Sequence, residues 1–67
     1  MGITLKAARV NKSLTQVEAA NVLGITPDTL RSWERAESFP NVLQIQKIEK
    51  LYGLTYSEII FLPSTTV

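Results

Sequence analysis

Residues 15–34 read TQVEAANVLGITPDTLRSWE, and they contain the signals for two consecutive short helices. Thr15 is a good N-cap, and Glu18 follows it by three residues, which is the signature of a capping box. Gly24 suits the left-handed conformation that commonly ends a helix. Thr26 then caps a second helix. Two helices with about three residues and a Gly between them form a helix-turn-helix pattern.

The second helix of this pair has two unlike faces. At about 100° per residue, one stripe is polar and cationic and comprises Asp28, Arg31, Ser32 and Arg35. Leu30, Trp33 and the side of Glu34 lie on the other face. An apolar rear face can pack on the preceding helix while the polar front lies in a DNA major groove.

Many spaced positions carry a family resemblance, namely Leu14-Thr15-Gln16, Ala19-Ala20, Leu23-Gly24-Ile25-Thr26 and Trp33-Glu34-Arg35. They resemble the small repressors typified by lambda-type phage repressors and Cro proteins. The resemblance extends from about Leu5 to about Ile60. It implies an all-α fold of five short helices, with the helix-turn-helix at helices two and three. We therefore expect one domain over residues 1–62 and a flexible tail over residues 63–67.

Composition limits the classes of function. The chain has 67 residues, no Cys, no His and a net charge of +1. We expect no metal, no cofactor and no catalytic site, because the usual ligands and acid–base groups are missing. No apolar run approaches the roughly 20 residues of a membrane helix, and no signal pattern opens the chain. We expect a cytoplasmic protein, and the small net charge neither proves nor excludes a nucleic-acid partner.

The cationic stripe predicts the residues that face DNA bases, with Arg31 at the centre and Asp28 and Ser32 beside it. Pro27, at the first position of the same helix, completes the expected base-contacting set. Backbone contacts are expected from Thr29, Arg35 and Lys12. The resemblance implies that Gln16 also bonds a phosphate and braces the recognition helix; the alternative is a solvated Gln in a first turn.

The resemblance also implies an ion pair between Arg9 and Glu34 that ties helix one to helix three; the alternative is a solvated Arg9. Two places depart from the family pattern. Ser13 stands where the family usually has Gly, so we expect the turn to differ or Asn11 to take the left-handed position. The segment after helix three carries Ala36 and Glu37 where Gly and basic residues are usual, and Glu37 would repel phosphate.

The last third of the chain predicts two more helices. Asn41 opens helix four and Gly53 ends it, with Val42, Ile45, Ile48 and Tyr52 expected to pack on helices one to three. A fifth helix is expected from about Tyr56 to Phe61. The apolar run Ile59, Ile60, Phe61 and Leu62 cannot all be buried on one side of so short a helix, so it predicts a dimer surface. Alternatively, Phe61 and Leu62 fold back over the chain's own core.

The expected function is sequence-specific binding of double-stranded DNA. The expected protein is a small phage- or prophage-type transcriptional repressor that acts as a homodimer on a pseudo-palindromic operator. No membrane and no small-molecule substrate is expected. The alternative is an antitoxin-like or adaptor protein whose main role is protein–protein interaction through the C-terminal apolar surface.

Overall fold

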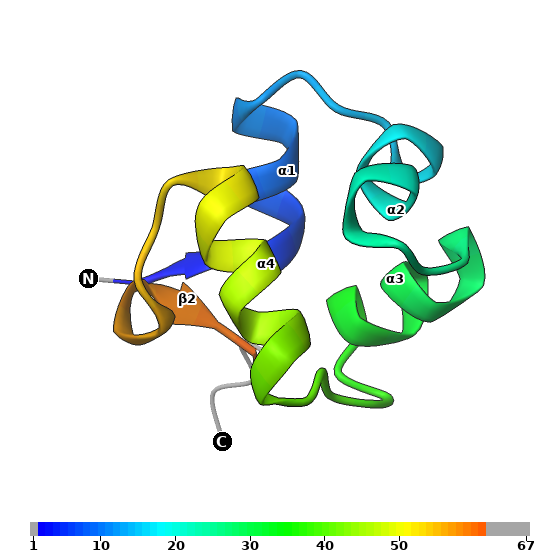
Figure 1. The fold of residues 1–67 in the computed structure, drawn as a ribbon. Coiled ribbons are helices and arrows are strands. Elements are labelled where there is room, and N and C mark those ends of the chain that lie inside the picture. The colour runs from blue at the N-terminus through cyan, green and yellow to red at the C-terminus, as the bar shows by residue number, and fades with distance from the viewer. Residues whose placement is uncertain (1, 62–67) are drawn as a thin grey trace.

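The computed structural model describes residues 2–61 and contains four α-helices, one 3₁₀-helix and one pair of short strands (Figure 1). The order is β1 (Ile3–Thr4), α1 (Leu5–Asn11), α2 (Gln16–Leu23), α3 (Pro27–Glu34), α4 (Val42–Tyr52), η1 (Tyr56–Glu58) and β2 (Ile59–Ile60). The fold is therefore mostly helical, and the helix-turn-helix at α2 and α3 lies where the sequence predicts it. None of the helices described is long and apolar enough to cross a membrane.

The prediction of a fifth helix was wrong. After the single turn of η1, Ile59 adopts extended backbone with φ −102° and ψ 131°. β2 then pairs in parallel with β1, with Ile3 opposite Ile59 and Thr4 opposite Ile60. β-branched residues favour extended backbone, and the start of the chain supplies a strand partner. Strands of two residues leave no periodic signal, so the sequence pattern alone did not show them.

Each of the four α-helices begins at a side-chain cap, as the sequence predicted for α2, α3 and α4. In each case a side-chain oxygen accepts a hydrogen bond from the backbone N–H three residues later, and the caps are Thr4, Thr15, Thr26 and Asn41. Thr15 and Asn41 each form a full capping box. These caps satisfy N–H groups that have no partner inside the helix.

The ends of the four helices share one geometry. A residue in the left-handed region closes each helix, and the following N–H bonds back to the carbonyl five residues earlier, as in the Schellman motif. The left-handed residues are Ser13 (φ 58°), Gly24 (φ 74°), Ala36 (φ 60°) and Gly53 (φ 68°). The expectation that the first turn would avoid Ser13 was wrong, because the bond from Leu14 N–H to Arg9 O requires this bend.

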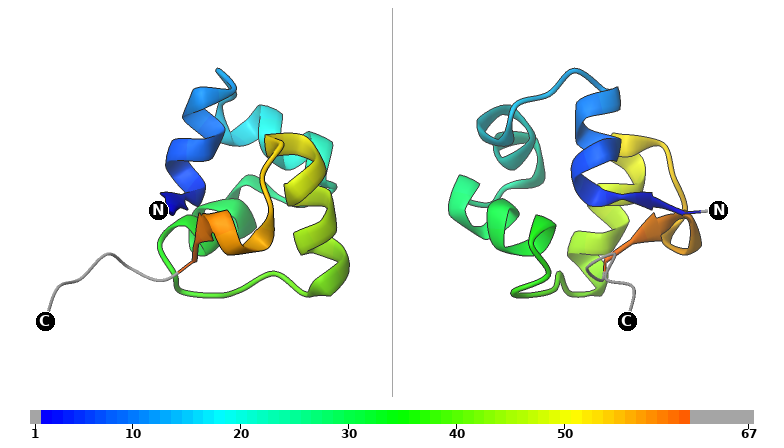
Figure 2. Two further views of the ribbon diagram at one scale, coloured as in Figure 1. Left: turned by 90° about the vertical axis from the view of Figure 1, so that its left-hand side faces the viewer. Right: turned by 180° about the vertical axis from the view of Figure 1, so that it is seen from behind.

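A single core lies between the helices, with Leu5, Ala19, Leu30 and Ile48 among its most buried members. Ala19 and Ala20 are fully buried, so small side chains on α2 let its neighbours approach closely. α4 runs between the strand pair and the α2–α3 unit in Figure 1 and in the right-hand view of Figure 2.

The predicted inner face of α4 was right for Ile48 and Tyr52, which are buried, and Ile45 is partly buried. It was wrong for Val42, whose exposed fraction is 70%. Val42 is the first residue of α4, and the next residue, Leu43, is equally exposed. The first turn of α4 therefore contributes little to the core.

Candidate nucleic-acid interface

α3 is anchored by its rear face. Leu30 is fully buried and Trp33 is 4% exposed, so both pack into the core. At the start of the helix, Thr26 Oγ1 accepts from the Thr29 N–H at 3.2 Å and lies 2.9 Å from the Thr29 hydroxyl. Pro27 occupies the first helical position, where its missing N–H has no consequence. The helix is thus held by one side and presents the other to solvent.

The solvent-facing side carries the predicted base-contacting residues. Pro27, Asp28 and Arg31 are exposed and Ser32 is half-buried. Asp28 Oδ1 lies 3.9 Å from Arg31 Nη2, and both side chains are more than half exposed. A guanidinium donates two hydrogen bonds to guanine, whereas a carboxylate only accepts, for example from the cytosine amino group. The face therefore presents a donor and an acceptor close together.

A buried network joins the first three helices. Arg9 Nε donates to Glu34 Oε2 at 2.7 Å, and Arg9 Nη2 lies 3.3 Å from Glu34 Oε1. Arg9 Nη1 donates to the carbonyl of Leu14 at 2.8 Å. The side chain of Arg9 is only 9% exposed and that of Glu34 only 3%. The structure thus brings together the pair that the resemblance implied, and the hydrogen bond to Glu34 raises the pKa of Arg9.

Gln16 belongs to the same network. Its Nε2 donates to Glu34 Oε1 at 3.0 Å, which places the side chain against the end of α3. A carboxamide nitrogen carries two hydrogens, so one remains available for another acceptor. The contact spans 18 residues of sequence, so no local pattern predicts it; the brace on α3 was expected only through the family resemblance.

The other three expected backbone contacts lie in different surroundings. Thr29 is half-buried beside its cap, and Arg35 is exposed at the end of α3. Lys12 Nζ lies 3.8 Å from where a Cβ on Gly53 would be, beside the C-terminal end of α4. The carbonyl end of a helix attracts a cation. The structure therefore groups Thr29 and Arg35 with α3 but places Lys12 with α4.

Comparison with known proteins was consistent with this geometry. A family model described as Helix-turn-helix matches residues 5–59. The chain belongs to this family, the Cro/C1-type helix-turn-helix proteins. Because the match covers α1 to α4, it includes the buried Arg9–Glu34 pair as well as the two helices of the motif.

Two curated relatives of this helix-turn-helix chain are transcriptional regulators. It is 29% identical over 56 residues to the cryptic phage CTXphi transcriptional repressor RstR of Vibrio cholerae. It is also 29% identical over 56 residues to the HTH-type transcriptional activator BcrR of Enterococcus faecalis. The matches cover 84% of this chain but only 50% of the repressor and 28% of the activator. No solved structure matches the chain.

The predicted dimer surface of this helix-turn-helix protein is divided by the fold. Ile59 is buried in the core, so its assignment to an exposed mating surface was wrong. Ile60 is 38% exposed, whereas Phe61 is half-buried and packs on the core, as the alternative interpretation held. Leu62 and the predicted tail over residues 63–67 lie outside the described residues.

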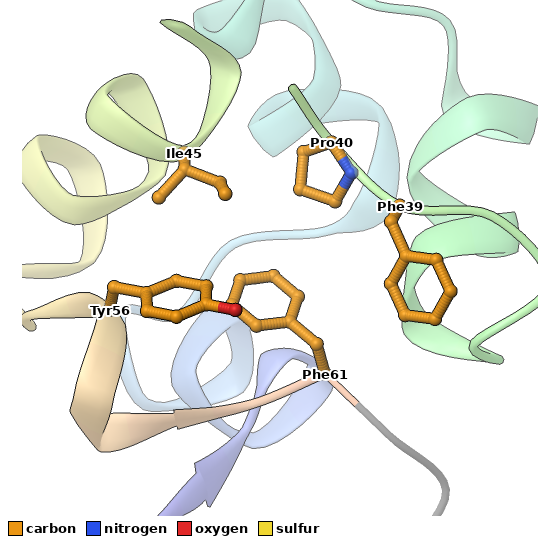
Figure 3. A pocket seen from close by; sticks show the side chains of 5 residues that line it. All are labelled: Phe39, Pro40, Ile45, Tyr56 and Phe61. Carbon is orange, nitrogen blue, oxygen red and sulfur yellow. The ribbon is translucent and has the colours of Figure 1, made fainter. Parts of the chain in front are cut away.

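A groove lies beside Phe61 instead. It has a volume of about 270 Å³ and is lined by Phe39, Pro40, Ile45, Tyr56 and Phe61. Tyr56 and Phe61 stack with ring centroids 5.4 Å apart and form one wall, opposite Ile45 and Pro40 (Figure 3). The sequence did not indicate this groove, because its lining comes from three separate segments.

Tyr52 is a further buried polar residue that the sequence assigned only to the core. The residue is 3% exposed, and residues 2–61 supply no hydrogen-bond partner for its hydroxyl. Burial, followed by the negative charge of Glu34, raises the pKa of Tyr52 to about 12. The hydroxyl therefore stays protonated at neutral pH and destabilises the core that holds it.

Proposed function

We propose that this chain binds double-stranded DNA in a sequence-specific manner and acts as a small transcriptional repressor. The observation that carries the proposal is the split of α3. Leu30 and Trp33 fix the helix from behind, while Asp28 and Arg31 stand exposed and adjacent on its front. The name of the phage repressor relative supports a prophage-type regulator.

In the proposed complex α3 lies in the major groove. Arg31 donates to O6 and N7 of a guanine, and Asp28 accepts from a cytosine N4 nearby. Pro27 and Ser32 border the same contact. Gln16 uses its second N–H on a phosphate while Glu34 holds the first, and Thr29 and Arg35 contact the backbone at either end of α3.

Two copies would form the repressor through an apolar face, defined here as Phe39, Val42, Leu43, Tyr56 and Ile60. These are five of the eight exposed large hydrophobic side chains within residues 2–61. Two of them, Phe39 and Tyr56, also line the groove of Figure 3, so this part of the surface offers a recess as well as exposed apolar side chains. A two-fold dimer places the same patch of each copy against the other, and such a patch can be complementary to itself.

A dimer of this kind predicts an operator with two-fold symmetry. Its half-sites should lie about 10–10.5 base pairs apart, or a multiple of this spacing. Selection from random duplex DNA followed by footprinting tests binding, sequence preference and symmetry together. A single asymmetric half-site at saturation would disprove the dimeric mode.

Variants of α3 separate base reading from backbone contact. Arg31→Ala should cost about 1–3 kcal/mol on the selected site and relax the preference at one base pair. Arg35→Ala should weaken binding to selected and scrambled duplex equally and reduce the salt slope by about one. If both variants lower both affinities by the same factor, Arg31 is only another backbone contact.

The dimer surface has its own matched test. Leu43 is 70% exposed on the apolar face, and Val10 is 55% exposed on α1. Leu43→Ser should shift sedimentation equilibrium toward monomer, whereas Val10→Ser should leave it unchanged, because only the first removes interface area. Equal behaviour of the two variants would exclude this face as the dimer contact.

The same apolar face favours a second candidate function, that of a protein-interaction module such as an antitoxin or adaptor. A mobility-shift assay with competitor DNA at physiological salt separates the two functions. A shift that survives a large excess of scrambled duplex supports the repressor, whereas the absence of any duplex binding leaves the interaction module.

A further inference from the structure

A carboxylate lies beside the cation at the end of α3. Arg35 Nε is 3.4 Å from Glu37 Oε2, and the two side chains are 62% and 57% exposed. Residues two apart on a helix do not face each other. Here the left-handed Ala36 lies between them, and the Glu37 N–H bonds back to Ser32 O at 2.9 Å. The end of the helix therefore positions Glu37 next to Arg35.

We infer that Glu37 is an internal competitor for the phosphate contact of Arg35 and so sets the overall affinity of the chain for DNA. This inference rests on the function proposed above. Carboxylate and phosphate oxygens bind the same N–H groups of a guanidinium. In the free protein Arg35 is paired with Glu37, so a phosphate must displace the carboxylate and leave it beside a polyanion.

The balance of charge on the exposed face supports the inference. Asp28 pairs with Arg31 and Glu37 pairs with Arg35, so this face carries two cations and two anions. Attraction to duplex DNA in general comes from unpaired cations that replace counterions along the backbone. A face neutralised in this way attracts random DNA weakly.

The effect of Glu37 should not depend on base sequence. Its carboxylate contacts Arg35, the expected backbone contact, whereas the expected base-reading cation, Arg31, pairs with Asp28. Backbone contacts add affinity without sequence information. We therefore expect Glu37 to change the affinity for every duplex equally and Asp28 to change the discrimination between sequences.

The test is a double-mutant cycle on DNA affinity. Wild type, Glu37→Gln, Arg35→Ala and the double variant are titrated with selected and scrambled duplex over a salt series at one protein concentration. Gln46→Lys serves as control, because Gln46 is exposed on α4 and the change also raises the net charge by one. Glu37→Gln should tighten both duplexes about two- to fivefold at low salt, the range expected when an exposed ion pair no longer competes.

The salt dependence and the second background make the test specific. The salt slope of Glu37→Gln should steepen by at most about 0.9, because the carboxylate no longer offsets the existing contact between Arg35 and phosphate. In the Arg35→Ala background, the increase in DNA affinity caused by Glu37→Gln should fall to the increase caused by the Gln46→Lys control. An equal gain in both backgrounds would mean long-range repulsion alone and would overturn the inference.

Two other results would also overturn it. One is an increase in affinity on Glu37→Gln that is no larger than the increase on Gln46→Lys. The other is an increase in affinity that is confined to the selected duplex. If wild type and every variant bind neither duplex, the proposed function itself fails, and that outcome is distinct from binding that is insensitive to Glu37.

Discussion

Replacement of Glu34 by Ala is the sharpest perturbation of this fold. The variant removes both side-chain contacts to the Arg9 guanidinium and the acceptor of the Gln16 amide. Arg9 keeps only its bond to the Leu14 carbonyl, yet it remains 8% exposed. A buried cation that loses its partner destabilises a protein by about 3–5 kcal/mol.

That loss is large for a chain of this size. At about 0.05–0.15 kcal/mol per residue, 67 residues have a free energy of unfolding of roughly 3–10 kcal/mol. About 4–8 °C of melting temperature is lost per kcal/mol in so small a domain. Glu34→Ala should therefore lower the melting temperature by well over 10 °C, and part of the protein should be unfolded at 37 °C.

The control is Glu37→Ala, which removes a carboxylate that is 57% exposed and paired with an exposed Arg35. Exposed pairs contribute about 0–1 kcal/mol, so this variant should melt within a few degrees of wild type. The assay is thermal and urea unfolding followed by circular dichroism at fixed protein concentration. Equal melting curves for the two variants would refute the assignment of Arg9–Glu34 as the buried support of α3.

A paired replacement separates the unpaired charge from the lost contact. In Arg9→Met with Glu34→Leu, no buried charge remains and the space is filled by apolar groups. Such replacements are often neutral or stabilising in other proteins. The double variant should therefore recover at least half of the stability that Glu34→Ala loses. A double variant as unstable as Glu34→Ala would show that contact geometry, not charge, dominates.

Three further predictions concern stability. Ala36→Gly and Ser13→Gly should each raise the free energy of unfolding by about 1 kcal/mol in urea titrations, because both positions have positive φ, whereas Ala7→Gly within α1 should lower it. Tyr52→Phe should stabilise the chain by about 1 kcal/mol at pH 7, because it deletes a buried hydroxyl that bonds to none of the described residues. The pKa of Tyr52 is about 12 in the folded chain and near 10 when unfolded. The stability of the wild type should therefore be intact below pH 10 and fall by up to about 3 kcal/mol between pH 10 and 12. Unfolding curves over a pH series should show a smaller drop for Tyr52→Phe.

Local chemistry allowed the helices to be predicted from the sequence. Thr15, Thr26 and Asn41 each satisfy N–H groups within three residues, and Gly24 and Gly53 supply left-handed ends. Such interactions depend on near neighbours, so sequence alone determines them. The buried Leu30 and Trp33 also follow from helical periodicity, because a helix packed from one side must bury one stripe.

Contacts between distant segments were the part that local rules did not reach. Ile59 becomes extended because Ile3, 56 residues earlier, pairs with it, and no pattern near Ile59 reports this partner. The bond from Gln16 to Glu34 is likewise long-range, and a brace by Gln16 on the recognition helix was expected only through the family resemblance. The Arg9–Glu34 pair was expected only through resemblance to a family, since a spacing of 25 residues has no meaning for a single helix.

The ion pairs that involve α3 and the segment just after it fall into two groups with different physical roles. Arg9 and Glu34 are buried together, so they fix the angle of α3 and are not available to DNA. Arg31 and Arg35 are exposed, and each has a carboxylate within 4 Å that a ligand must displace. A DNA-binding surface whose cations are already paired gains little affinity from each phosphate contact. Each new contact between Arg and phosphate replaces an existing contact between Arg and a carboxylate. In the proposed complex, stable occupancy of an operator would therefore depend on base contacts made by two copies together, which would make the reading face of α3 dependent on the proposed dimer contact.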